Sequence, residues 1–421
     1  MSKHANCNGC REYNTLNRRD FMRYSGLGLT ALLAEAWLPR VAFAQSGANR
    51  DVVISIFLRG GADGLSLCVP HGDDGYYNAR PSESIRRPGT DGGAIDLDGF
   101  FGLAPAMQSL YPVYDAGDLA IIHACGLTDS SRSHFDAMYL METGDTGDAF
   151  TATGWLGRHL LNTGALDPNG VLRAIAVSPS LQRTLAGSPS ALPVPDPGAF
   201  TFDQDDERLA ILQELYAETV EPLRGASENT FRTLAALEAI DYNNYTPAGG
   251  AVYPNTGFGD GMQATAALIK AGIGVEAFAL DLGGWDTHAG QGARNGGLAN
   301  LMRELAEGLA AFHTDVIAAG NRNVVVTVMS EFGRNVKENA SQGTDHGYGG
   351  AMFVLGGHVN GGQVLGNWPG LTADELFEQQ DLYITTDYRN VLAEILQKRA
   401  GAASLGNVFP GLTPAFPGVI A

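Results

Sequence analysis

Residues 51–66 read DVVISIFLRGGADGLS, an apolar run that ends in a glycine-rich polar turn. The run at 51–58 lacks the alternation of apolar and polar residues that marks a strand with one face in water, so it predicts a strand buried on both faces. Five more short runs share this character: DLAIIHAC (118–125), LRAIAVS (172–178), VEAFALDLG (275–283), NVVVTVMS (323–330) and AMFVLGG (351–357). Such runs are typical of a parallel sheet that lies between layers of helices.

Helical patterns alternate with these runs, at 133–143, 206–222, 227–242, 260–271, 297–319 and 387–399. This alternation predicts an α/β fold with a mostly parallel central sheet and helices on both faces. The segment 179–260 carries few strand signals, so we expect it to be an insertion or a cap on one large domain that covers residues 45–421.

The first 44 residues read as an export signal. Arg18 and Arg19 precede a weakly apolar stretch that closes on Ala42-Phe43-Ala44, the small-x-small pattern cut by signal peptidase. Paired arginines of this kind predict a twin-arginine signal, hence the twin-arginine translocase as a partner and a periplasmic or extracellular location. The apolar stretch is too short for a stable membrane span.

Charge and cysteine content narrow the possible partners. Cleavage after residue 44 would change the net charge from −19 to −22, because the removed segment holds six basic and three acidic residues. So acidic a chain argues against nucleic acid and anionic lipid as partners, since both need cationic patches. The mature chain keeps Cys68 and Cys125, and whether they form a disulfide stays open.

Polar side chains collect after four of the expected strands. Each has an ordinary explanation on its own: Asp63-Gly64 is a common turn pair, Ser133 could simply cap a helix, and His134 could be a packed or surface histidine. Together they form a set of carboxylates and imidazoles that suits Zn²⁺ or Mn²⁺, with Ca²⁺ as another possibility. The four clusters contain Asp63, Ser133, His134, Asp281, Asp286, His288, Glu331, Arg334, Asp345 and His346, and the expected ligands are the Asp and His residues that lie beside glycines, around Asp63, Asp286 and Asp345.

A resemblance supports this interpretation. The strings FLRGGADGLS, RSHFDAM, GGWDTH, SEFGR, GTDHG and TTDYR resemble those of an exported bacterial family known only as domain of unknown function 1501. That family is similar in layout to the alkaline phosphatase and sulfatase superfamily. The resemblance implies an alkaline-phosphatase-like three-layer α/β/α sandwich.

The resemblance also implies roles for single residues. Asp63 stands where the superfamily has its first metal carboxylate, and Ser133 stands near the place of its nucleophile, with Ser130 and Ser131 as rivals. Asp286 and His288 match the carboxylate and histidine of one ion. Asp345 and His346 match a pair divided between two ions, which adjacent residues in a loop can serve at a spacing of about 4 Å.

Two features depart from the superfamily pattern. One residue separates Asp286 from His288, where three are usual, and the final metal histidine has only His358 as a downstream candidate.

The implied activity is hydrolysis of phosphate or sulfate esters of small molecules or glycans at a one- or two-metal site. Ser133 would attack the ester, His134 would assist, and Arg334 or Arg132 would clamp the substrate's oxygens. The alternative is a non-catalytic periplasmic protein that keeps the fold and binds a partner.

Overall fold

The computed structural model describes residues 50–421 except 146–150, 168–169, 189, 198–205 and 243. The expected signal peptide, residues 1–44, lies outside this part of the chain. In the described part, no helix has the length and apolar character needed to cross a membrane.

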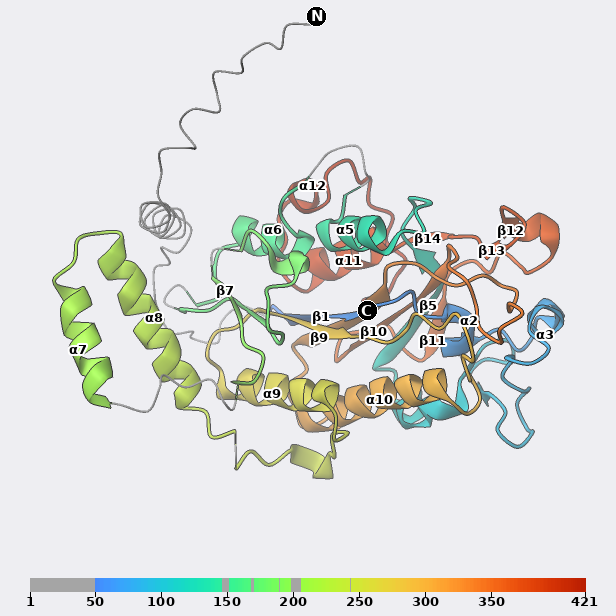
Figure 1. The fold of residues 1–421 in the computed structure, drawn as a ribbon, viewed down its shortest axis with the longest axis horizontal. Helices are drawn as coiled ribbons and strands as arrows, with labels where there is room; N and C mark the ends of the chain where they lie inside the picture. The colour runs from blue at the N-terminus through green and yellow to red at the C-terminus, as the bar shows by residue number, and fades with distance from the viewer. Residues whose placement is uncertain (1–49, 146–150, 168–169, 189, 198–205, 243) are drawn as a thin grey trace, which may run out of the picture.

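A mixed sheet crosses the middle of the molecule (Figure 1). Its main strand order is β11-β5-β10-β9-β1-β8-β6-β7, and β14 also pairs with β5. The bounds are β1 (Val52–Leu58), β5 (Leu119–Gly126), β6 (Ala174–Ala176), β7 (Ala191–Pro193), β8 (Ala277–Leu282), β9 (Val324–Ser330), β10 (Gly350–Gly356), β11 (Gln363–Leu365) and β14 (Thr386–Asp387). All six strands expected from the sequence are present, and the three that were not expected have two or three residues each.

The sheet is mostly but not wholly parallel. Strand β10 runs antiparallel to both of its neighbours, β5 and β9, whereas the other pairs are parallel. The expectation that 351–357 joins a parallel sheet is therefore wrong for this strand. The reason lies in the connection, since residues 331–349 contain no helix that could carry the chain back for a parallel crossover. This loop instead joins the end of β9 to the start of β10 at the rim of the sheet where the strand ends lie.

Helices cover both faces of the sheet (Figure 1). On one side lie α5 (His134–Thr143), α6 (Trp155–Asn162), α11 (Tyr388–Lys398) and α12 (Leu405–Val408), and on the other lie α9 (Gly257–Ala271) and α10 (Gly297–Phe312). Strand β1 contributes buried side chains to the core on both faces of the sheet. Ile54 and Ile56 belong to one buried cluster, and Val53 and Phe57 belong to the other. The expected burial on two faces is thus confirmed.

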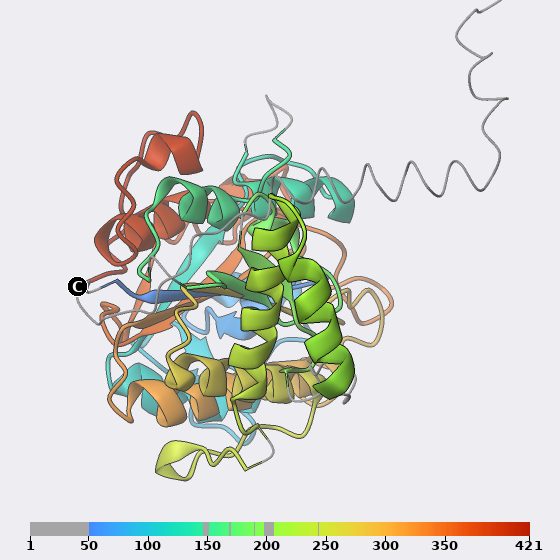
Figure 2. The same ribbon diagram turned by 90° about the vertical axis from the view of Figure 1, so that its left-hand side faces the viewer.

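Two helices and two small sheets lie outside this core. Helices α7 (Asp206–Ala217) and α8 (Leu223–Glu238) lie side by side beyond the β7 edge (Figures 1 and 2). Beyond the opposite end lie α2 (Gly64–Leu67), α3 (Asp74–Ala79) and two small sheets. The small sheets consist of β2 (Cys68–Val69), β3 (Ile95–Asp96) and β4 (Gly102–Leu103), and of β12 (Leu376–Phe377) with β13 (Asp381–Leu382). Cys68 and Cys125 are buried free thiols, so the disulfide that the sequence left open is not formed.

Candidate metal centre

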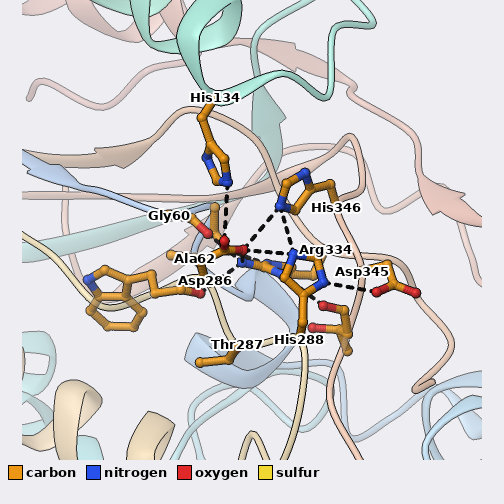
Figure 3. A network of polar contacts seen from close by, with 12 residues as sticks. Gly60, Ala62, His134, Asp286, Thr287, His288, Arg334, Asp345 and His346 are labelled. Carbon is orange, nitrogen blue, oxygen red and sulfur yellow. Dashed lines mark hydrogen bonds and ion pairs between the residues drawn. The ribbon is translucent and has the colours of Figure 1, made fainter. Parts of the chain in front are cut away.

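Four side chains from distant parts of the sequence meet at the edge of the sheet where β1, β8 and β9 end (Figure 3). His134 is the first residue of α5, which follows β5. Asp286 and His288 lie in the loop after β8, and His346 lies in the loop between β9 and β10. The topology therefore brings the four together because the parallel strands end, and the antiparallel β10 begins, at the same edge.

Asp286 lies at the centre of this group, which we call the His/Asp cluster (His134, Asp286, His288 and His346). Its Oδ1 atom lies 3.0 Å from Nε2 of His288 and 3.0 Å from Nε2 of His346. Its Oδ2 atom lies 3.4 Å from Nε2 of His134. The Nε2 atoms of His288 and His346 are themselves 3.0 Å apart. Three imidazole nitrogens thus point at one carboxylate (Figure 3).

Nδ1, the second ring nitrogen of each histidine in the cluster, lies within hydrogen-bond distance of an oxygen that can accept. Nδ1 of His134 lies 2.8 Å from Oε1 of Glu331, and Nδ1 of His288 lies 2.9 Å from Oδ1 of Asp345. Nδ1 of His346 lies 2.9 Å from the main-chain oxygen of Arg132, which can only accept. A proton on each Nδ1 satisfies all three contacts, and this tautomer leaves the Nε2 lone pairs directed into the cluster. Carboxylate or carbonyl partners of this kind orient metal-binding histidines in proteins.

Lone pairs and a carboxylate that face one another repel unless a proton or a cation lies between them. One potential ligand atom from each of His134, Asp286 and His346 lies within 4.8 Å of the others, a spacing at which the three could hold a metal ion together. Imidazole nitrogen with carboxylate oxygen is a donor set that suits Zn²⁺ and related divalent ions. His288 is not part of this group of three, but its Nε2 atom lies 3.0 Å from Oδ1 of Asp286 and 3.0 Å from Nε2 of His346.

The ionised form of Asp286 is held by its neighbours. Partial burial acts to raise the pKa of this carboxyl, but the hydrogen bond from Arg334, together with the contact with His346, outweighs that effect and lowers the pKa to about 2. Nη2 of Arg334 donates to Oδ1 of Asp286 at 2.7 Å. Asp286 therefore carries its charge throughout the physiological range of pH.

Arg334 has a role different from the one expected. It was expected to clamp substrate oxygens, but its side chain is only 1% exposed. Its guanidinium donates to the main-chain oxygens of Gly60, Gly61, Thr344 and Trp285 besides Asp286. Arg334 thus holds the loops that carry the cluster together. Arg132, the other candidate clamp, donates to Asp381 and Glu378.

Two glycines allow the loops to approach so closely. A Cβ atom on Gly60 would lie 2.5 Å from the main-chain nitrogen of Asp286, and one on Gly343 would lie 2.3 Å from the main chain of His288. Real Cβ atoms do not come so near, so side chains at these positions would displace two residues of the cluster. The glycines of RGGADG and GTDHG therefore serve the close approach that the sequence suggested.

Asp63 does not join the cluster. It is 1% exposed and is paired with the guanidinium of Arg80, whose Nη2 lies 3.0 Å from Oδ1. Ser66 and Gln291 donate to its Oδ2. Burial acts to raise its pKa, but the attraction of Arg80 outweighs that and holds the pKa below its usual value. Its neighbours thus occupy both carboxylate oxygens, and the expected metal ligand is part of a buried ion pair instead.

The remaining predicted residues lie near the cluster or far from it. Asp345 contacts Nδ1 of His288 and lies outside the group that His134, Asp286 and His346 form. Ser133 is the N-cap of α5, half-buried and directly before His134, and its hydroxyl makes no capping hydrogen bond. Ser131 accepts a bond from the main chain of Ser133, and Ser130 is exposed. His358 follows β10, and because this strand is antiparallel it lies at the opposite edge of the sheet.

Sequence reasoning missed two contributors. Arg80 was never singled out, and no local pattern reveals that it pairs with a carboxylate 17 positions earlier. The main-chain oxygen of Arg132 carries no sequence signal at all, although it fixes the ring of His346. His134 was expected to assist catalysis, whereas the structure places it among the potential ligands.

Residues 199–409, half of the 421-residue chain, match the family model described as "Protein of unknown function (DUF1501)". The chain belongs to this family. The region matched by the DUF1501 model contains Asp286, His288, Arg334, Asp345 and His346, whereas Asp63 and His134 precede it. No curated protein matches the chain.

Proposed function

We propose that this DUF1501 protein is a metal-dependent hydrolase of phosphate or sulfate esters, with one divalent cation held by the His/Asp cluster. One observation carries the proposal: three Nε2 atoms converge on Asp286 while an acceptor engages every Nδ1. That arrangement is preorganised for a cation. A purely structural group of histidines would not need all three lone pairs on the same side.

A bound Zn²⁺ or Mn²⁺ would act as a Lewis acid and lower the pKa of a coordinated hydroxyl or water. The chain would contribute the nucleophile and its position. Ser133 precedes His134 in the chain, and no capping hydrogen bond engages its hydroxyl. These two facts favour Ser133 over Ser130 and Ser131 as the group that attacks the ester. The phosphorus or sulfur centre would exchange the leaving alcohol, which takes up the serine proton, for the serine oxygen. Water would then hydrolyse the serine ester, which releases phosphate or sulfate and restores the serine hydroxyl.

The proposal favours one ion over two. The two-ion arrangement would need Asp63 and a division of Asp345 from His346. Asp63 is paired with Arg80, and Asp345 is the acceptor for His288. The described residues offer His134, Asp286 and His346 as ligands of a single cation, and we propose that His288 joins them.

Asp63 and Asp345 do not serve as ligands here, so the site has fewer carboxylate ligands than a two-ion hydrolase needs. This favours the alternative function, a non-catalytic protein that keeps the cation and binds a partner. The two functions differ in turnover and not in metal content. A protein that holds one equivalent of metal and hydrolyses no ester would support the binding protein.

We further propose that the protein acts in the periplasm or outside the cell after twin-arginine export. Arg18 and Arg19 with the site at 42–44 support this. Export in the folded state fits a metal site, because the ion can be inserted before transport. Cell fractionation of the wild type and of Arg18→Lys with Arg19→Lys tests the proposal, since the variant should stay in the cytoplasm with its signal uncleaved.

The activity is tested on protein stripped with a chelator and reloaded with Zn²⁺, Mn²⁺ or Ca²⁺. The substrates are p-nitrophenyl phosphate, bis-p-nitrophenyl phosphate and p-nitrophenyl sulfate. We expect hydrolysis of at least one of them by reloaded protein and none by stripped protein or by His346→Ala. Equal rates with and without metal would refute the proposal.

A further inference from the structure

A cleft of about 560 Å³ lies beside the His/Asp cluster. Its wall is formed by the end of α3, by residues 335–340 and by the β12–β13 hairpin. Asp345 belongs to this wall and also contacts Nδ1 of His288. Asp345 would therefore separate a molecule in the cleft from His288, one of the proposed metal ligands.

The side chains that line the cleft are rich in groups that both donate and accept hydrogen bonds. Asn78, Gln379 and Gln380 are exposed to it, and their amides make no hydrogen bond with any described residue. Each primary amide offers two donors and one acceptor oxygen, which matches hydroxyl groups that also do both. Leu371 and Leu376 add an apolar surface between them.

The lining also excludes other ligands. Among the described residues, no aromatic ring lines the cleft, so they offer no platform on which a nucleobase could stack. Of the lining residues in the described part of the chain, Lys337 alone is cationic, and Glu338 lies beside it. This balance does not suit a ligand that carries several negative charges.

The rim of the cleft is held in an unusual conformation. Glu378 and Gln379, between β12 and β13, have φ angles of 51° and 59°, a left-handed conformation that residues other than glycine rarely adopt. Glu378 accepts a hydrogen bond from Nη2 of Arg132 at 2.7 Å, and the main-chain oxygen of Arg132 is the acceptor for His346. The rim is thus tied to the cluster through one residue.

We infer that this cleft binds an uncharged, polyhydroxylated part of the substrate, so that the esters hydrolysed at the metal centre are esters of carbohydrates. The inference rests on the proposed function, because it assigns the substrate class of the same site. The amides of Asn78, Gln379 and Gln380 would hold sugar hydroxyls, and Leu371 and Leu376 would contact the apolar face of a sugar ring.

The test is calorimetric titration of the full mature chain with neutral cello-, xylo- and malto-oligosaccharides and with an uncharged tetrapeptide amide as the competing class. We expect at least one oligosaccharide to bind and the peptide not to bind. The double variant Asn78→Ala with Gln380→Ala should bind about tenfold more weakly, because it loses several neutral hydrogen bonds. Gln397→Ala, which removes an exposed amide on α11, should bind as the wild type does.

The titration is repeated with His346→Ala so that the two proposals can fail separately. If the protein binds no metal and hydrolyses no ester but still binds oligosaccharides through Asn78 and Gln380, the hydrolase proposal falls together with the assignment of carbohydrate esters as its substrates, whereas carbohydrate binding in the cleft stands. The cleft inference is wrong if no oligosaccharide binds, if the peptide binds instead, or if the double variant and Gln397→Ala bind alike.

Discussion

Oδ1 of Asp345 lies 2.9 Å from Nδ1 of His288, and this hydrogen bond is the main reason why the pKa of Asp345 is lowered. The contact makes Asp345 a residue that orients a ligand. We expect Asp345→Ala to weaken metal binding roughly 10–100-fold without abolishing it, as loss of such partners does in metal sites. The dissociation constant for Zn²⁺, measured by competition with a chromophoric chelator, checks this.

The control for that variant is Asp115→Ala, which removes an exposed carboxylate before the start of β5, whereas His134 follows the other end of this strand, so the affinity should stay unchanged. Unaltered affinity in Asp345→Ala would show that the contact with His288 does not matter. Complete loss of the ion would make Asp345 a ligand itself.

Asp63→Asn separates stability from metal binding. The substitution leaves the guanidinium of Arg80, which is 0% exposed, without its charged partner. Loss of one partner of a buried pair costs roughly 3–5 kcal/mol in the free energy of unfolding. We expect a loss of that size in urea denaturation, while the folded variant keeps one equivalent of metal. A variant of normal stability that binds no metal would restore Asp63 to the ligand set.

Ser133→Ala tests the nucleophile. Its hydroxyl makes no capping hydrogen bond, so the variant should fold normally. We expect turnover of p-nitrophenyl esters to be lost while metal content, measured by elemental analysis, stays unchanged. Ser130→Ala is the matched control and should remain active. Retained turnover in Ser133→Ala would remove this serine from the mechanism.

The strands of the core could be predicted because their apolar runs have no polar alternation. The direction of β10 could not be predicted, since the run AMFVLGG looks the same in either direction and the connecting loop decides between them. Strands such as β11 and β14 are too short to show a pattern, and only pairing with β5 reveals them.

Some residues of the candidate site could likewise be predicted from the sequence, and others could not. Asp286, His288 and His346 could be found because they follow or precede strands that end at one edge of the sheet. The sequence could not separate Asp63 from them, because the partner that removes it, Arg80, lies in a different segment. Neither could it assign His134, since a histidine at the start of a helix is equally common as a surface residue.

A buried histidine gives a prediction about pH. Burial lowers the pKa of His123 to about 4, whereas a histidine in the unfolded chain titrates near 6.5. Between these values the unfolded chain binds a proton that the folded chain does not, so the free energy of unfolding falls as the pH falls from about 6.5 to about 4. The contribution from His123 is of order 3 kcal/mol.

Urea denaturation at several pH values measures this dependence. His123→Gln should reduce the loss of stability across that window, whereas His358→Gln, a substitution at a half-buried position outside the core, should not. An unchanged pH dependence in His123→Gln would mean that this histidine is already protonated in the folded protein.

Anomalous diffraction from crystals soaked in ZnCl₂, recorded at the zinc edge, tests the existence of the metal centre most directly. We predict one strong peak in contact with His134, Asp286, His288 and His346, at one equivalent per chain, and no peak there in His346→Ala. Folded crystals that show no peak among these four residues, or a peak only elsewhere, would contradict the account.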